Sequence, residues 1–267
     1  MIKMIKSLGL ALIIEFILIN CLPTLANTKT NLELPKSETV INEDIDNNGK
    51  PDRIVSSYFI RSVLVPKYNS KTCQTLLGKF VRYTLYADGE KTGKVILEQS
   101  YGTSLVSYWV HRLTLDKDID GDGRKELFFY TGDDTSEEKI YLFLKPDGVK
   151  KVYLGVTDLP GAKLNENFDL QFFRGNVFAQ WNRSEQLWKS QNNRYLWTLG
   201  DCVEIRERPD ARSKIVRMIS KNEILTVFQP QTASGWIGVD LDGQKGWIKI
   251  NNISFTSPVS MIRFAKP

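Results

Sequence analysis

Residues 118–130 read DIDGDGRKELFFY, an acidic, glycine-containing loop that runs directly into large apolar residues. Residues 44–60, DIDNNGKPDRIVSSYFI, repeat this arrangement earlier in the chain. Both loops fit D-x-D-x-[D/N]-G-x-x-[D/E], with oxygen-bearing side chains at positions 1, 3, 5 and 9 and glycine at position 6. Many residues that follow the loops are β-branched or aromatic, which favours strands. The pattern predicts a β protein in which each acidic loop leads into a strand.

The oxygen atoms of these loops predict calcium binding. Carboxylates this close together repel one another unless a cation lies among them, and calcium accepts several oxygen ligands in flexible geometry. The expected ligands of the second loop are Asp118, Asp120, Asp122, Glu126 and the backbone carbonyl of Arg124. Those of the first loop are Asp44, Asp46, Asn48, Asp52 and the backbone carbonyl of Lys50. The alternative is a pair of ordinary turns, because Asp, Asn and Gly favour turns without any ion.

Both loops differ from EF-hand loops, because a strand is expected directly after each of them. An EF-hand loop has flanking helices and a bidentate Glu at position 12, whereas this position holds Val55 in the first loop and Phe129 in the second. The loops resemble instead the calcium loops of FG-GAP and VCBS repeats, in which a tight metal loop lies between strands. Two copies are too few for a propeller, so a single curved sheet or a small sandwich is expected.

The region from residue 40 to residue 199 reads as a mainly antiparallel β domain. Apolar and β-branched runs alternate with turn signals such as Ala87-Asp88-Gly89 and Pro146-Asp147-Gly148. The expected strands are 54–65, 80–86, 95–99, 105–115, 127–130, 140–144, 152–156, 168–173, 177–181 and 194–199. No long amphipathic helix is predicted. The fold class is therefore all-β.

Residues 200–257 carry a different pattern. It includes Val203-x-Ile205-Arg206 followed by Pro209, then Gly235-Trp236, Asp242-Gly243 and Gly246-Trp247-Ile248. In order and spacing this segment resembles bacterial SH3-like (SH3b) domains, which implies a small five-stranded barrel. The resemblance also implies a binding module for peptidoglycan or an envelope protein, with Arg206, Trp236 and Trp247 lining the groove. The alternative is that these three side chains fill the core.

The N-terminus has the features of a signal peptide. Lys3 and Lys6 precede an apolar run over residues 8–19 that is interrupted only by Glu15, and Thr24-Leu25-Ala26 is an acceptable cleavage site. The predicted organisation is a signal peptide over residues 1–26, a flexible leader over 27–39, the two domains, and a C-terminal tail over 258–267. An uncleaved anchor and a lipoprotein modified at Cys21 are the alternatives. No stable membrane insertion is expected after cleavage.

Export leaves Cys73 and Cys202 in the mature chain. Thiols in an oxidising compartment form disulfides, and an even number favours pairing. Two cysteines so distant in sequence pair only if the fold brings them together, so a Cys73–Cys202 bond is a hypothesis.

Catalysis finds little support in the sequence. His111 is the only histidine, and it alternates with Trp109, Leu113 and Leu115 as a partly buried strand residue. Nucleophilic catalysis would have to use it as the base. Glu137 and Glu138, with Asp133 and Asp134, could mimic the carboxylate pair of a glycoside hydrolase, but they fall in an expected hairpin turn, which favours a solvated loop. Most of the aromatic residues are expected in the core, with a sugar-stacking platform as the alternative: Trp181, Trp188, Trp197, Tyr101, Tyr108 and Trp109.

The sequence thus predicts an exported, non-enzymatic binding protein with two calcium loops and an SH3-like module. The net charge of +5 is spread along the chain without a basic, aromatic-rich block, so nucleic acid is not an expected partner. A cell-wall hydrolase targeted by the SH3-like module and a secreted inhibitor or immunity-type protein are the alternative functions.

The signal-peptide prediction has a direct test. N-terminal sequencing of the mature protein is expected to begin at Asn27, the residue after the predicted cleavage site. A mature protein that begins with a lipid-modified Cys21 would contradict this cleavage and place the protein on a membrane surface.

Overall fold

The computed structural model describes residues 34–67, 70–103, 110–132, 137–157, 163–171, 176–241 and 243–264. The fold is all-β, with 61% of the described residues in strands and 4% helical, as the sequence predicted. Within these ranges no helix is long and apolar enough to span a membrane. The expected signal peptide, most of the leader, Tyr108, Trp109, Asp133 and Asp134 lie outside the described residues, as do the side chains of Glu137 and Glu138.

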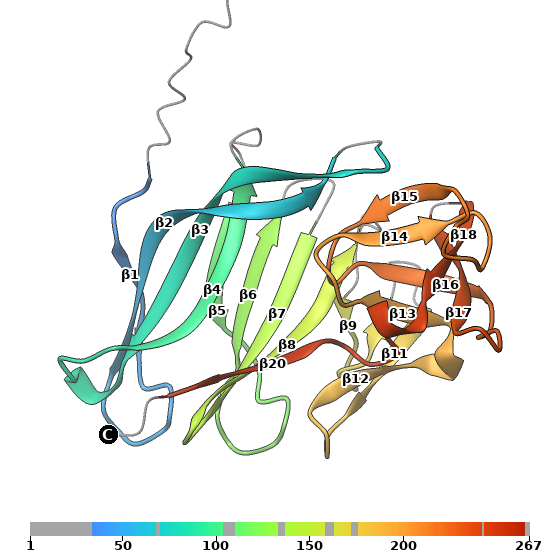
Figure 1. Ribbon diagram of the computed structural model, residues 1–267. Helices are drawn as coiled ribbons and strands as arrows, with labels where there is room; N and C mark the ends of the chain where they lie inside the picture. Colours follow the sequence, from blue (N-terminus) through green and yellow to red (C-terminus); the bar gives the residue numbers. More distant parts are fainter. Residues whose placement is uncertain are drawn as a thin grey trace, which may run out of the picture. The chain divides into compact units, whose positions relative to one another are not determined.

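The first sheet follows the order β1-β2-β3-β4, with every neighbouring pair antiparallel. Its strands are β1 (Glu38–Glu43), β2 (Asp52–Pro66), β3 (Cys73–Tyr86) and β4 (Lys94–Thr103), and a short 3-10 turn, η1 (Ala87–Gly89), follows β3. β2 and β3 form a long hairpin (Figure 1). β1 covers the edge of β2 only as far as Ser56.

The second sheet, called here the central sheet, has the order β20-β8-β7-β6-β5 and is antiparallel throughout. Its strands are β5 (Val110–Leu115), β6 (Leu127–Gly132), β7 (Glu137–Lys145), β8 (Gly148–Thr157) and β20 (Val259–Arg263). β7 and β8 meet across the predicted Pro146-Asp147-Gly148 turn, where Lys145 pairs with Gly148. β20 comes from the segment that the sequence left as a C-terminal tail.

The remaining strands form two further sheets. The third sheet contains β9 (Lys163–Leu164), β10 (Leu170–Gln171), β11 (Val177–Asn182) and β12 (Leu187–Ser190), followed by η2 (Gln191–Asn193). The C-terminal sheet has the order β15-β14-β18-β17-β16-β13-β19. Its elements are β13 (Tyr195–Thr198), β14 (Val203–Arg206), β15 (Ile215–Ile219), β16 (Ile224–Gln229), β17 (Trp236–Leu241), β18 (Gln244–Lys249), η3 (Ile250–Asn252) and β19 (Ile253–Ser254). Since β13 pairs with β16 and β19, this sheet starts before residue 200.

The central sheet is buried on both faces. Ile140 and Leu142 of β7 pack into one apolar core with residues of the first sheet, such as Val81 and Leu97. Tyr141 and Phe143 point to the other face and pack into a second core with the third sheet. Because successive side chains of a strand point to opposite faces, the run of four apolar residues fills both cores at once.

The C-terminal sheet also contacts the rest of residues 34–267 through apolar packing and a hydrogen bond. Trp197 of β13 is fully buried in the second core, and its Nε1 donates a hydrogen bond to the backbone carbonyl of Leu154 on β8 at 3.1 Å. The C-terminal sheet also has a core of its own, which includes Val203, Ile237 and Val239. Residues 34–267 therefore form one compact unit.

The closing strand β20 depends on a close approach at Gly148. A Cβ atom at this position would lie 2.1 Å from the backbone carbonyl oxygen of Ile262. Any side chain at residue 148 would push β20 away from β8, because a backbone atom cannot move aside as a flexible side chain can.

The structure pairs Cys73 with Cys202, at a Cα–Cα distance of 6.5 Å and a sequence separation of 129 residues. The bond joins the first residue of β3 to the residue before β14, so it ties the tip of the β2–β3 hairpin to the C-terminal sheet. The hypothesis of pairing is confirmed.

Removing this disulfide is expected to destabilise the protein by about 2–5 kcal/mol, because a cross-link that closes a loop of this length restricts the unfolded chain. The measurement is a urea unfolding curve of the double variant Cys73→Ser/Cys202→Ser and of the wild type. Wild type in reducing agent serves as the control and should match the variant. Equal free energies of unfolding for oxidised wild type and variant would contradict a stabilising cross-link.

Candidate metal-binding loops

The two acidic loops occupy equivalent places in the fold. The first acidic loop (residues 44–52) connects β1 to β2, and the second acidic loop (residues 118–126) connects β5 to β6. They lie side by side at one end of the two sheets (Figure 1), where Asn47 Nδ2 donates a hydrogen bond to the backbone carbonyl of Gly123 at 3.4 Å. Loops far apart in sequence therefore form one acidic end of the molecule.

Each loop is anchored by the isoleucine at its second position. Ile45 is 3% exposed and belongs to the first core, whereas Ile119 is fully buried in the second core. The carboxylate at position 9 accepts a hydrogen bond from the backbone amide of this isoleucine: Asp52 from Ile45 at 2.9 Å and Glu126 from Ile119 at 2.6 Å. Burial of the isoleucine thus fixes the carboxylate that closes the loop.

The glycine at position 6 allows both loops to turn back on themselves. Gly49 and Gly123 share a φ of 87°, a conformation that glycine adopts without steric cost. Their amides donate to the carboxylate at position 1, at 2.7 Å to Asp44 and 3.0 Å to Asp118. At position 5, Asn48 and Asp122 each accept a backbone amide, from Lys50 and Arg124 respectively, at 2.9 Å. Each loop is therefore held by the same pattern of backbone-to-side-chain hydrogen bonds, called here the hydrogen-bonded frame.

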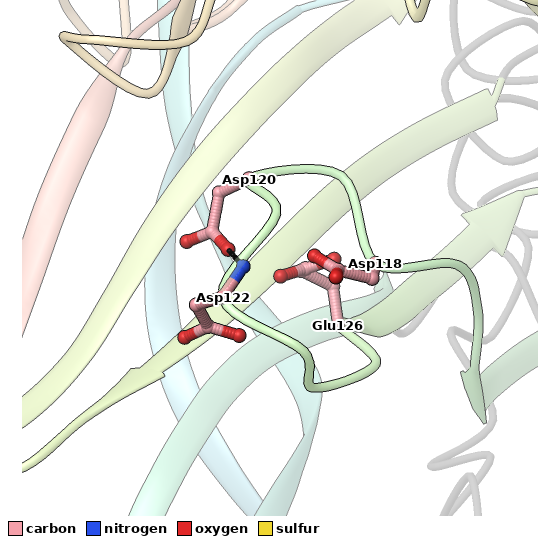
Figure 2. A group of neighbouring side chains, drawn as sticks. All are labelled: Asp118, Asp120, Asp122 and Glu126. Atoms are coloured by element: carbon pink, nitrogen blue, oxygen red, sulfur yellow. Dashed lines mark hydrogen bonds between the residues drawn. The ribbon is translucent and has the colours of Figure 1, made fainter.

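The frame brings the predicted carboxylates together. In the second loop Asp118, Asp120, Asp122 and Glu126 each place a ligand oxygen within 4.8 Å of the others, as do Asp44, Asp46 and Asp52 in the first loop. Figure 2 shows the carboxylates of Asp118 and Glu126 next to each other, with Asp120 and Asp122 beside them. Oxygens that share one calcium ion at about 2.3–2.6 Å are at most about 5 Å apart. The separations in both loops fit a single cation.

The side chain of Asp46 in the first loop has a buried carboxylate oxygen whose hydrogen-bonding capacity is not satisfied. Its Oδ1 atom is buried and has no hydrogen-bond partner in the described part of the chain. A buried carboxylate oxygen without a donor is costly. A cation held by Asp44, Asp46 and Asp52 would satisfy it.

Asp120, at the equivalent position of the second loop, is already paired. Its Oδ2 accepts hydrogen bonds from Lys145 Nζ at 2.8 Å and from Gln186 Nε2, and its side chain is 3% exposed. Lys145 Nζ also lies 4.0 Å from Asp122. A metal ion in this loop would share the carboxylate of Asp120 with a lysine, which lowers the net attraction for the metal.

Burial raises the pKa of Glu126 from 4.5 to about 7. The hydrogen bond from the Ile119 amide opposes this shift, and the negative charges of Asp120, Asp118 and Asp122 add to it. The second loop without metal therefore favours a protonated Glu126 below neutral pH. A bound cation would reverse this preference by stabilising the ionised form.

Arg206, Trp236 and Trp247, which the SH3b resemblance predicts as ligand-binding residues, lie on one face of the C-terminal sheet. Arg206 pairs across the sheet with Trp247, and Trp236 pairs with Lys249, two residues farther along β18. Trp236 is 4% exposed, with Lys249 Nζ 4.7 Å from its ring centre. Arg206 is held by an ion pair with Glu204 and by a hydrogen bond to the backbone carbonyl of Ser213.

Trp247 is the one of these three with an accessible aromatic neighbour. Phe228, which the sequence analysis did not single out, is 40% exposed and lies edge-on to Trp247 with ring centres 5.8 Å apart. Phe228 sits at a register shift in β16, and a Cβ on Gly238 would lie 2.7 Å from its ring. The glycine opposite Trp247 is the sequence signal for this aromatic pair.

Other partners of the acidic loops carried no local sequence signal. Lys145 and Gln186 reach Asp120 from β7 and from the β11–β12 turn, and Asp88 of η1 accepts a hydrogen bond from Asn48 Nδ2 at 2.8 Å. These contacts arise from packing between segments distant in sequence, so spacing within a motif does not predict them.

Four of the aromatic residues expected in the core are described by the structure, and three of these four are buried. Trp188 and Trp197 have no exposed surface, Tyr101 is 8% exposed, and Trp181 is half-buried against the second core. Trp188 Nε1 donates to the backbone carbonyl of Phe168 at 2.7 Å. These side chains form no open sugar-stacking platform.

No family model matches this sequence, and no curated protein or solved structure matches it.

The raised pKa of Glu126 predicts the direction in which the stability of the metal-free protein changes with pH. Between about pH 4.5 and pH 7 the folded protein binds more protons than the unfolded chain, so its melting temperature should fall as the pH rises through this interval. Glu126→Gln keeps an acceptor for the Ile119 amide but does not titrate, so it should flatten this part of the profile. Thermal melts in chelator across this pH range provide the measurement, and an identical slope in wild type and variant would contradict the assignment.

Proposed function

We propose that this chain is an exported, non-enzymatic binding protein that holds a calcium ion in each acidic loop. The buried, unpartnered Asp46 Oδ1 carries the proposal for metal binding, because it lies in a loop whose three carboxylates already converge. The second loop supports it with four carboxylates on the same hydrogen-bonded frame. Calcium is the cation favoured by an all-oxygen ligand set, to which the Lys50 and Arg124 carbonyls would add.

Calcium in these loops has a structural role. Each loop joins two strands of a sheet, and the loops touch one another at Asn47 and Gly123. A cation that binds only the folded state stabilises it by about 2.7 kcal/mol at a hundredfold excess over Kd. The Cys73–Cys202 disulfide supports export, because such bonds persist in oxidising compartments.

The binding surface in this proposal is the aromatic face of the C-terminal sheet, in line with the SH3b resemblance. Trp247 and Phe228 present neighbouring rings, and Lys245 Nζ lies 5.3 Å from the Phe228 ring centre. Rings of this kind stack on sugars or on peptide side chains, which fits peptidoglycan as the partner; an envelope protein is the alternative outcome of the test.

Calcium binding is tested by isothermal titration and by thermal melts with calcium and with chelator. Two ions per chain and a rise of several degrees in melting temperature are expected. Asp46→Asn should remove one ion, and Lys145→Met should tighten the second site by relieving competition for Asp120. Asp147→Asn is the matched control, since Asp147 is an exposed carboxylate outside both loops. Unchanged melts with calcium in every variant would identify the loops as ordinary turns.

The binding partner is tested by incubating the mature protein with labelled peptidoglycan. Retention without release of soluble fragments supports a binding module, whereas released fragments would indicate a hydrolase. Trp247→Ala and Phe228→Ala should weaken retention, whereas Met261→Ala, which removes an exposed apolar side chain from β20, should not. Capture of an envelope protein without peptidoglycan would assign the face to a protein partner.

A further inference from the structure

The side chains between the first sheet and the central sheet change from apolar to polar along the length of the strands. Close to the acidic loops the inward-facing residues are apolar, such as Ile54, Leu85 and Leu113. Farther along the same strands, Tyr101 on β4 belongs to the first core and Tyr58 on β2 packs against it. His111 on β5 contacts both rings, and Thr131 on β6 is its cross-strand neighbour. Tyr58 lies six residues beyond the first loop, about 20 Å at the rise of a strand. This polar end is separate from the acidic loops.

The four polar residues form one cluster. His111 Nε2 and the Tyr58 hydroxyl lie 3.3 Å apart, and the ring centres of Tyr101 and His111 are separated by 4.5 Å. Tyr58 lies edge-on to both rings, at 5.8 Å from Tyr101 and 5.6 Å from His111. Thr131 is the cross-strand neighbour of His111, so their side chains share a face. His111 therefore lies between the two sheets with Tyr101 and Thr131 beside it.

Two hydroxyl groups of this cluster are buried without a partner. Tyr101 is 8% exposed and Thr131 is fully buried, yet neither Tyr101 OH nor Thr131 Oγ1 has a hydrogen-bond partner in the residues that the structure describes. Buried hydroxyls are nearly always paired with protein or with ordered water. Two unpaired hydroxyls beside one partly exposed imidazole point to a missing hydrogen-bonding group.

We propose that this polar end binds a small, uncharged, planar molecule with a hydroxyl or amide group, such as a phenol or an aromatic amide. The hydroxyls of Tyr101 and Thr131 would pair with its polar group, and the rings of Tyr58, Tyr101 and His111 would contact its flat face and edges. The proposal is independent of calcium binding and of the C-terminal sheet.

The charges around the cluster favour a neutral ligand. Burial lowers the pKa of His111, against an opposing effect of the Glu38 carboxylate, so burial favours the neutral imidazole. Glu38 lies close enough for its charge to be felt, and Ser56 Oγ donates to the Glu38 backbone carbonyl at 3.3 Å. An anionic ligand would be repelled by Glu38. A cationic ligand would be attracted by Glu38, but it would exchange its hydration for hydroxyl groups and an imidazole, since none of the four cluster residues carries a carboxylate.

The test follows the ring protons of His111 by NMR, since the chain has one histidine. The mature protein is titrated with phenol, with benzamide and with toluene, an apolar analogue of phenol. Phenol or benzamide should give saturable shifts, and toluene should bind at least about tenfold more weakly, the value of one hydrogen bond. Tyr101→Phe and Thr131→Val should each weaken phenol or benzamide binding by a similar factor. Ser260→Ala removes another unpaired buried hydroxyl, on β20, and should leave binding unchanged.

Melting curves without ligand separate a binding role from a structural one. If the hydroxyls await a ligand, Tyr101→Phe and Thr131→Val should melt no lower than wild type, because each removes an unpaired buried group. The absence of saturable shifts with phenol and benzamide would overturn the proposal. So would equal affinity for toluene and phenol. Lower melting temperatures with unchanged binding would also overturn it, because they would assign the hydroxyls to a structural water.

Discussion

Burial of the central sheet on both faces is the constraint on which the rest of the structure depends. The run Ile140–Phe143 supplies side chains alternately to two cores, so the register of β7 is fixed from both sides. A shift of one residue would exchange the two sets of side chains, placing Tyr141 and Phe143 in the first core and Ile140 and Leu142 in the second. The first and third sheets, and the C-terminal sheet through Trp197, all pack against this layer.

The acidic loops are anchored in the two cores that lie on either side of the central sheet. Ile45 belongs to the first core and Ile119 to the second, so each loop is tied to a different face of the central sheet. The second loop also contacts the third sheet through Gln186, and the first contacts η1 through Asp88. The loops are therefore part of the packing between layers and not appendages of single hairpins. Their carboxylates are positioned by apolar burial as much as by hydrogen bonds.

Local sequence signals predicted the β class, the strand after each acidic loop, the β7–β8 turn and the convergence of the carboxylates. These features depend on spacing within a few residues. The two-sided burial of β7, the entry of β13 into the C-terminal sheet and the pairing of β20 with β8 depend on contacts between distant segments, which a short pattern does not encode. The same reason explains why Lys145 was not foreseen as a partner of Asp120, and why burial of Trp236 leaves Phe228 as the accessible neighbour of Trp247.

The pairing of β20 with β8 has a consequence for the order of folding. β20 follows the strands of the third sheet and the C-terminal sheet in the chain, yet it forms the edge of a sheet whose other strands come before both of them. The hairpins β2–β3 and β7–β8 involve local contacts and can form early, whereas closure by β20 must bring together distant parts of the chain and is correspondingly slow. During synthesis the edge of β8 stays open and the central sheet stays incomplete. An edge of this kind can pair with another chain, so slow closure by β20 exposes the folding protein to edge-to-edge association.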